Sequence, residues 1–161
     1  MTIRGFEESD REAMCDLAVR VFEAVSIDAA MEREYGELNG TTWQDRKRGA
    51  VSDDLDRNPE GCFVAEAEGR IVGFITTAVD QQVSIGHIPN LGVDEGLQGR
   101  GIGKALVSRA LDYFEAEGIR YTQIETTTTN ERGMRFYPGM GYREVARKIH
   151  YFMALSDRKD R

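Results

Sequence analysis

A glycine-rich turn between an apolar strand and an amphipathic helix constrains the fold of this chain more than any other feature. The strand pattern ends at Val93, the turn spans Gly96–Gly103, and apolar residues then recur at helical spacing over Leu106–Phe114. Alternating glycines allow the backbone to approach a ligand without obstruction from Cβ atoms. The first amides of a helix have no partner within it, and the helix dipole is positive there. We therefore predict a site for a phosphate or pyrophosphate group, with Arg100 and Lys104 adding positive charge beside it.

Two common nucleotide-binding patterns do not fit this turn. A Walker loop requires Ser or Thr after its Gly-Lys pair, whereas the Gly-Lys pair here is followed by Ala105. The dinucleotide pattern Gly-x-Gly-x-x-Gly fails in both registers, because its third glycine would fall on Lys104 or on Leu106. The turn therefore does not indicate a P-loop or a Rossmann fold.

Strand and helix periods alternate along the chain, with two helices before a three-stranded meander. The predicted strands are Thr2–Phe6, Cys62–Ala67, Ile71–Val79, Gln82–Val93, Tyr121–Thr126 and one or two strands within Arg143–Leu155. The first predicted helix begins at a capping box, Ser9–Glu12, and ends at about Ser26; a weakly helical stretch follows over 29–37. Another helix begins at a Thr41 or Thr42 cap and ends at Arg57. Two more are predicted, one directly after the glycine turn and a short one that begins at an Asn130 cap. Pro89 cannot donate a ladder hydrogen bond, so its strand is expected to be bulged or unpaired there. This order predicts an α/β or α+β sheet with helices on both faces.

Two motifs resemble those of the GNAT superfamily of N-acetyltransferases. The spacing Gln98-x-x-Gly101-x-Gly103 resembles the acyl-CoA loop of that family. The stretch Ile124–Tyr142 resembles its second signature: a strand, an Asn cap, a short helix with an aromatic-Tyr pair, and a Gly-aromatic entry to the next strand. Gly133 and Pro138 depart from that signature without removing a functional group.

The resemblance covers Thr2 to Leu155 and implies a particular fold. We expect a mixed, mostly antiparallel sheet of six to seven strands, with helices on both faces and a split between the fourth and fifth strands. We expect one domain over residues 1–155, followed by a flexible tail at 156–161.

The same resemblance implies that acetyl-CoA lies in the split of the sheet. Backbone groups of Leu91 and Val93 would pair with the pantetheine arm, and amides of the glycine turn would hold the pyrophosphate. Asn130 would contact the pantetheine or cap its helix, and both alternatives stay open. The implied cofactor-binding residues are Leu91, Gly92, Val93, Gln98, Gly99, Arg100, Gly101, Ile102, Gly103, Lys104 and Asn130.

Acyl transfer from a thioester to an amine requires a neutral amine, stabilisation of the oxyanion and an acid for the departing thiolate. The resemblance implies that Tyr137 is the acid, although the same side chain could be a core aromatic beside Phe136. Three alternatives remain for the base: His87, since histidine is the usual side chain for proton transfer near neutral pH, Glu125 on the facing strand, or a chain of water molecules. If Ile124 is a core residue, alternation along the strand directs Glu125 to the opposite face.

The net charge and its distribution limit the classes of partner that the chain is expected to bind. The formal net charge is −7, which argues against a general nucleic-acid binder. Residues 1–60 contain 15 acidic and 8 basic side chains, whereas residues 61–161 carry equal numbers. The resemblance places this acidic third around the acceptor, with Glu32, Glu34, Glu37 and Asp45 in the stretch expected to line its entrance. This favours a cationic or neutral amine, either a small molecule or a peptide. Solvated helix faces would explain the same charges. We also allow for a homodimer.

The remaining composition favours a cytoplasmic protein without a metal site. No apolar stretch is long enough to span a membrane, and the N-terminus lacks the apolar region of a signal peptide. Cys15 and Cys62 are expected to be reduced thiols, and two His without a Cys-x-x-Cys pattern make a zinc site unexpected. The alternative to an amine N-acetyltransferase is a non-catalytic acyl-CoA-binding module. The presence of Tyr137, of Gln98 and of the intact glycine pattern favours the enzyme.

Overall fold

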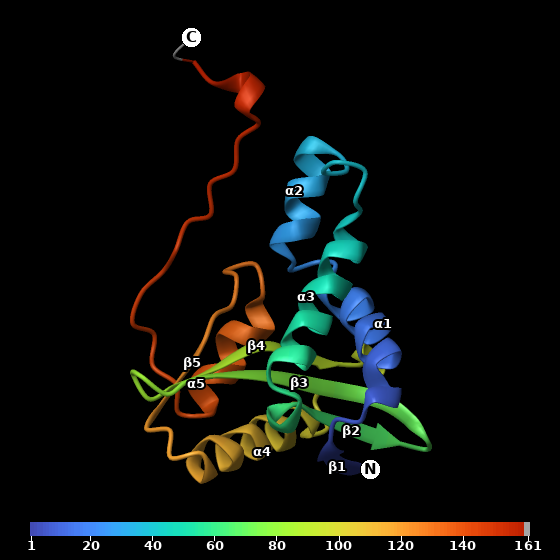
Figure 1. The fold of residues 1–161 in the computed structure, drawn as a ribbon, viewed down its shortest axis with the longest axis vertical. Helices are drawn as coiled ribbons and strands as arrows, with labels where there is room; N and C mark the ends of the chain where they lie inside the picture. Colours follow the sequence, from blue (N-terminus) through green and yellow to red (C-terminus); the bar gives the residue numbers. More distant parts are fainter. Residues whose placement is uncertain (160–161) are drawn as a thin grey trace.

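The computed structural model describes residues 1–159 and contains one open sheet with helices on both faces (Figure 1). Its strands are β1 (Thr2–Gly5), β2 (Phe63–Ala67), β3 (Arg70–Asp80), β4 (Ile85–Val93) and β5 (Tyr121–Ile124). Its helices are α1 (Arg11–Phe22), α2 (Ile27–Tyr35), α3 (Trp43–Arg57), α4 (Ile102–Ala116) and α5 (Glu131–Gly139), with short 3-10 turns at Glu8–Asp10, Pro59–Gly61, Glu95–Leu97 and Leu155–Asp157. The element order from β1 to α5 is the predicted one except before β2, where the weakly helical stretch forms a full helix, α2, and makes three helices instead of two.

The strands lie in the sheet in chain order, β1-β2-β3-β4-β5. All neighbours pair antiparallel except β4 and β5, which are parallel. A tight turn joins β2 to β3 with positive φ at Glu68 and Gly69, as expected for a two-residue hairpin. The mixed, mostly antiparallel sheet is therefore confirmed.

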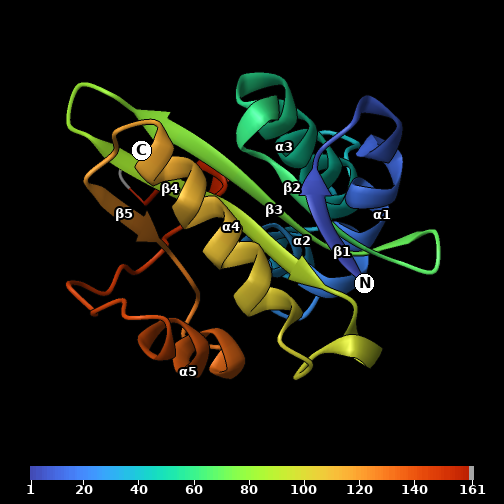
Figure 2. The same cartoon turned by 90° about the horizontal axis from the view of Figure 1, so that it is seen from below.

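Each face of the sheet has its own core. On one face, α1 and α3 cover apolar side chains that include Leu17, Leu55 and Phe74. On the other face, α4 crosses the strands (Figure 2) and packs Leu106 and Phe114 onto the sheet. None of the helices in the part of the chain that the structure describes is long and apolar enough to cross a membrane.

Pro89 lies where the pairing of β4 changes on both of its edges. Toward β3, the register shifts between Thr76↔Asn90 and Ala78↔His87, so two residues of β4 oppose one residue of β3. Toward β5, the parallel ladder ends at Ile88↔Ile124, although β4 continues to Val93. The bulge and the split between the fourth and fifth strands are both confirmed, and the missing N–H of proline accounts for their position.

The helix starts agree with the sequence in most places. Thr42 and Asp45 form a capping box at the start of α3, and the side chain of Asn130 accepts from the amide of Gly133 at the start of α5. The prediction that Ser9 begins a capping box for the first helix is wrong. Asp10 accepts from the amide of Glu7 at 2.9 Å and from both terminal nitrogens of Arg4 at 2.7 and 2.8 Å. This carboxylate, fixed by Arg4, organises the turn that precedes α1.

The prediction of strands within Arg143–Leu155 is also wrong. These residues form an extended segment that leaves the sheet (Figure 1), so the sheet has five strands and not six to seven. We call residues 143–155 the C-terminal arm. Of the predicted tail at 156–161, residues 156–159 belong to the described part of the chain, and residues 160–161 lie outside it.

Candidate functional site

The free half of β4 forms one wall of the candidate site. Leu91, Gly92 and Val93 pair with β3 through one edge. Their other edge has no ladder partner within residues 1–159, because the pairing with β5 ends at Ile88. An extended ligand can add to such an edge through main-chain hydrogen bonds, in the manner of an extra strand.

The loop that follows β4 is held close to the end of the strand. The amide of Asp94 donates to the carbonyl of Val72 at 2.8 Å, and its side chain accepts from the amide of Gly96 at 3.1 Å. Gln98 donates from Nε2 to the carbonyl of Val93 at 2.9 Å. Gln98 therefore closes the loop onto β4.

The first turn of α4 presents a row of unused donors. Gly99 and Gly101 have φ of 81° and 83°, a left-handed conformation that favours glycine. The first intrahelical bond comes from the amide of Ala105 to the carbonyl of Gly101. Hydrogen bonding within the described chain therefore leaves the amides of residues 99–104 without an acceptor. Together with the exposed side chains of Arg100 and Lys104, these donors suit a phosphate-bearing ligand.

Helix α5 packs beside this turn. A Cβ on Gly103 would lie 3.6 Å from the ring of Phe136, which is ordinary van der Waals contact. Asn130 fixes the start of α5, since its Oδ1 accepts from Gly133 and its Nδ2 donates to the hydroxyl of Thr126 at 2.9 Å. The structure thus assigns the cap to Asn130, and its contact with a pantetheine arm stays a prediction.

Tyr137 occupies the inner side of α5 among other aromatic rings. Its ring centre lies 5.2 Å from that of Phe136 and 6.1 Å from that of Tyr142, whose hydroxyl is 3.1 Å from the hydroxyl of Thr122. Burial, with a smaller contribution from Tyr142, raises the pKa of Tyr137 to about 12. Its hydroxyl has no hydrogen-bond partner within residues 1–159, yet it is not sealed from solvent. The phenol therefore stays protonated at neutral pH and is free to donate.

The two candidate bases lie on the opposite face of the sheet from α4. A Cβ on Gly86 would meet the ring of Phe114 in α4, and Ile88 is buried in the same core, so the intervening His87 faces the other way. His87 lines a pocket of ≈ 240 Å³ with its ladder neighbour Gln123. In the part of the chain that the structure describes, its imidazole has no hydrogen-bond partner.

Glu125 is a poorer candidate for the base than His87. Ile124 packs against the core beneath α4, so Glu125 points to the other face, as alternation predicts. Its carboxylate is exposed and forms an ion pair with Lys148 of the C-terminal arm. The structure thus places His87 and Glu125 on the same face of the sheet, but the exposed carboxylate of Glu125 is occupied by its ion pair with Lys148.

A buried polar network fixes the free half of β4 and was not predicted from the sequence. Asn90 donates from Nδ2 to Asp54 at 2.8 Å and to Thr76 at 3.2 Å, and its Oδ1 accepts from Lys47. Thr76 also donates to Asp54 at 3.0 Å. Burial lowers the pKa of Lys47. One signal could have revealed the network: Lys47 and Asp54 interrupt the apolar face of α3 at helical spacing.

Helix α2 and the segments around it lie on the side of His87. Glu32 accepts from the amide of Trp43, which is buried, and lies 3.6 Å from Arg46, while Asp45 is used in the cap of α3. Of the four carboxylates predicted to line an acceptor entrance, Glu34, Glu37 and Asp45 are exposed without an ion pair in the described chain, and only Glu34 and Glu37 have no cap to hold them. The hydroxyl of Thr127, after β5, donates to the carbonyl of Val25, which joins the two sides of this region.

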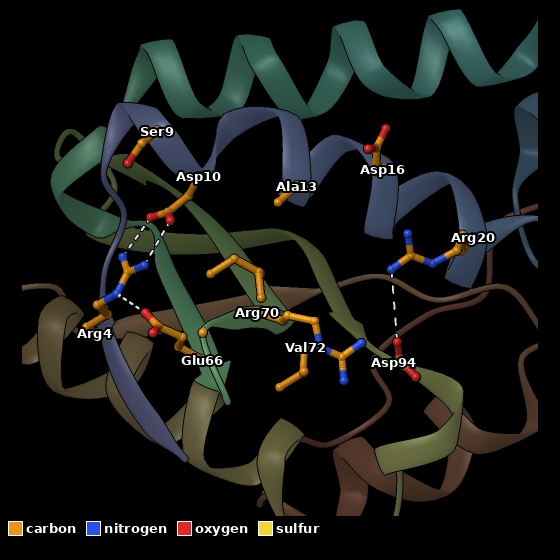
Figure 3. A pocket seen from close by; sticks show the side chains of 12 residues that line it. Arg4, Ser9, Asp10, Ala13, Asp16, Arg20, Glu66, Arg70, Val72 and Asp94 are labelled. Carbon is orange, nitrogen blue, oxygen red and sulfur yellow. Dashed lines mark hydrogen bonds and ion pairs between the residues drawn. The ribbon is translucent and has the colours of Figure 1, made fainter.

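A larger cavity of ≈ 690 Å³ lies between α1 and the β2–β3 hairpin (Figure 3). Its lining carries both charges, including the Arg4–Asp10 pair and Arg20, which lies 3.9 Å from Asp94. It shares only Asp94 with the loop after β4, so it is separate from the predicted site.

Within residues 1–159 no cluster of His, Cys, Asp or Glu could hold a metal ion, and Cys15 and Cys62 are free and buried.

Comparison with known proteins identifies relatives of the chain. The model of the Acetyltransferase (GNAT) family matches residues 25–142. The mycothiol acetyltransferase of Streptomyces avermitilis is 35% identical over 143 residues, which cover 88% of this chain and 42% of that protein. The corresponding enzyme of Streptomyces griseus is 32% identical over 136 residues, covering 78% and 43%. The chain therefore spans less than half the length of these curated relatives.

Solved structures agree on the fold. The ribosomal-protein-S18-alanine N-acetyltransferase of Escherichia coli superposes with a TM-score of 0.68 at 19% identity, covering 98% of this chain and 86% of that one. The aminoglycoside acetyltransferase AAC(6')-Iy, in complex with a bisubstrate analogue of CoA, superposes with a TM-score of 0.67 at 16% identity, covering 95% and 97%.

Proposed function

The chain belongs to the GNAT acetyltransferase family, and from this premise we propose that it transfers an acetyl group from acetyl-CoA to a primary amine by direct attack in a ternary complex. One observation carries the proposal. The amides of residues 99–104 lack acceptors at the point where the free edge of β4 ends, and the protonated Tyr137 lies on the adjacent helix α5.

The residues present suit acetyl-CoA. The amides of residues 99–104, with Arg100 and Lys104, would hold the pyrophosphate, because unpaired donors at a helix N-terminus favour anions. Leu91, Gly92 and Val93 would pair with the pantetheine arm along the free edge of β4. When bound, acetyl-CoA supplies an activated thioester, and every other requirement of the reaction falls to side chains of this protein.

Proton transfer requires an acid and a base on the two sides of the split. Tyr137 would hold a proton on its hydroxyl and give it to the departing thiolate, since a pKa of about 12 keeps it protonated. His87 would accept the proton of the attacking amine, directly or through water, because it faces a pocket on the opposite side of the sheet and carries no competing ion pair. Glu125 would remain in its ion pair with Lys148.

The proposed class of acceptor amine follows from the exposed carboxylates near α2. Glu34 and Glu37 are exposed near the tip of α2 and carry no ion pair in the described chain, so they would attract a cationic amine and repel an anionic one. Exposed charges are screened over about 8 Å at physiological salt. The ratio of kcat/KM for a matched cationic and anionic amine should therefore favour the cationic one and fall as salt is added.

Release of free CoA thiol from acetyl-CoA, measured with a panel of amines, peptides and aminoglycosides, tests the proposed function. Amine-dependent release, together with formation of the N-acetylated amine, is the expected result. Binding of acetyl-CoA without release for any acceptor would instead identify a non-catalytic acyl-CoA-binding module.

A further inference from the structure

The cavity between α1 and the β2–β3 hairpin has no part in the proposed acetyl transfer. Its volume of ≈ 690 Å³ suits a small metabolite, because ligand pockets commonly enclose about 300–1,000 Å³. Seven charged side chains line it, four acidic and three basic. The class of ligand that the cavity can bind therefore depends on which of these charges already have partners in the chain.

The four carboxylates of the cavity all accept hydrogen bonds within the chain. Asp10 and Glu66 accept from Arg4, Asp16 accepts from Arg48, and Asp94 accepts from the amide of Gly96. A cationic ligand would have to compete with these donors for every carboxylate. The acidic side chains therefore do not make the cavity a site for a cation.

Two of the three arginines, in contrast, have no hydrogen-bond acceptor within residues 1–159. Arg20, in the last turn of α1, lies 3.9 Å from Asp94, which is too long for a hydrogen bond. Arg70, the first residue of β3, is exposed, and its side chain forms no ion pair in the described chain. Figure 3 shows the guanidinium groups of both residues at the end of the cavity where Asp94 lies. The unused charges of the cavity are thus positive.

Two unused guanidinium groups favour a ligand with two carboxylates. Each guanidinium is a planar fork that can hold one carboxylate through two parallel N–H···O bonds. The lining also contains the apolar side chains of Ala13, Ile71 and Val72, which suit a short hydrocarbon chain. A small dicarboxylate combines these two properties.

Asp94 connects this cavity to the loop after β4. Its carboxylate accepts from the amide of Gly96 at 3.1 Å, and its own amide donates at 2.8 Å to the carbonyl of Val72, which also lines the cavity. A dicarboxylate on Arg20 withdraws a cation from Asp94 and adds negative charge beside the loop. Both changes disfavour a second anion on the amides of residues 99–104. The coupling is reciprocal, so acetyl-CoA disfavours the dicarboxylate by the same factor.

We propose that the cavity is an effector site for a small dicarboxylate, which binds Arg20 and Arg70 and lowers the affinity of the loop after β4 for acetyl-CoA. The lowered affinity rests on the proposed binding of acetyl-CoA at that loop, whereas the binding of the dicarboxylate does not. The two parts are therefore measured separately.

Calorimetric titration of the full chain with succinate tests the site itself. We expect one succinate per chain, and succinamate, which keeps the carbon skeleton but has one carboxylate, should bind at least about tenfold more weakly. Arg20→Gln combined with Arg70→Gln should abolish binding. Arg33→Gln combined with Arg158→Gln removes the same charge from two exposed arginines outside the cavity and should leave binding unchanged.

Gly101→Glu separates this site from the loop after β4. The substitution places a carboxylate among the amides of that loop, and it should leave succinate binding intact. A chain that does not bind succinate would overturn the proposal. Succinate binding that survives the loss of both cavity arginines, or that is lost in Gly101→Glu, would overturn it as well.

The Kd for acetyl-CoA, measured with and without saturating succinate, tests the coupling. We expect succinate to raise this Kd about fivefold in the unmodified chain and to leave it unchanged in the variant that lacks Arg20 and Arg70. An unchanged Kd in the unmodified chain, or an equal rise in both proteins, would overturn the effector role alone. A chain that binds succinate but never acetyl-CoA would contradict the proposed function together with that role.

Discussion

The ammonium group of Lys47 in α3 donates a hydrogen bond to the side-chain oxygen of Asn90 in β4. Asn90 follows Pro89 and lies in the half of β4 that has no partner in β5. Its Nδ2 donates to the buried carboxylate of Asp54, so one amide joins a cation and an anion of α3 to the strand. The free half of β4 is thus held by β3 on one edge and by α3 from the face of the sheet, without a strand of the described chain on its other edge.

Asn90→Ala should lower both stability and the affinity for acetyl-CoA. The substitution leaves Lys47 and Asp54 without a shared partner, and an unsatisfied buried polar group costs about 1–3 kcal/mol. The loosened strand should raise KM for acetyl-CoA, measured beside the unfolding free energy. Thr76→Val is the matched control: it removes the bonds of Thr76 to Asp54 and Asn90, leaves the bonds of Asn90 to Lys47 and Asp54, and should reduce stability without changing that KM. An unchanged KM in Asn90→Ala would show that the network supports the fold alone.

Gly101→Glu should abolish the stabilisation that acetyl-CoA provides. It places a carboxylate among the amides of residues 99–104 and forces a non-glycine residue to φ of 83°. For the unmodified chain, ligand at about 100 times its Kd should add about 2.7 kcal/mol, seen as a thermal shift. Gly69→Glu carries the same charge and a similar backbone strain, with φ of 70°, in the distant β2–β3 turn, and it should keep the shift. Equal shifts in the two variants would exclude the loop after β4 as the binding site.

His87→Gln should reduce kcat/KM far more than Glu125→Gln. General-base catalysis contributes typically about 10²–10⁴-fold, and the paired, exposed carboxylate of Glu125 is not placed to supply it. Added imidazole should restore part of the activity of His87→Gln, which a purely structural role would not allow. If Glu125→Gln is the more damaging change, the assignment of the base is reversed. If neither change matters, a chain of water molecules removes the proton.

Tyr137 should ionise far above the ordinary tyrosine range. The difference in phenolate absorbance between the unmodified chain and Tyr137→Phe should have its midpoint near pH 12, rather than near the usual value of about 10. Because the pKa of Tyr137 is raised on folding, its contribution to stability is complete below pH 10 and is lost as the pH rises toward 12. A midpoint near 10 would mean that the hydroxyl is well solvated and is not held as a proton donor.

The parts of the fold that depend on local chemistry could be predicted from the sequence. The cap at Thr42, the helix end at Arg57 and the cap at Asn130 were all predicted, and they depend on near neighbours in the chain. Pro89 located the bulge and the split, because the loss of one donor has the same consequence in any sheet. The candidate anion site followed in the same way from glycines before a helix.

The remaining features depend on partners distant in the chain. The strands predicted within residues 143–155 are wrong, because a local pattern does not identify a pairing partner and this segment pairs with no strand in the described chain. Ser9 matches the local pattern of a helix cap, but the hydrogen bonds between Arg4 and Asp10 organise the turn before α1 instead. The ion pair between Glu125 and Lys148 joins residues 23 positions apart, and no spacing rule indicates it.

The kinetics of Tyr137→Phe test the central claim most directly, since they ask whether a hydroxyl beside the split completes the transfer. The steady-state kcat with a productive amine should fall about 10²-fold or more, as on removal of a general acid. The Kd for acetyl-CoA should change little, because the hydroxyl acts on the departing thiolate and not on the ground state. Tyr121→Phe, at an exposed tyrosine of β5, should leave both values unchanged. A Tyr137→Phe variant with the kcat of the unmodified chain would contradict the account and leave Tyr137 a packing residue of α5.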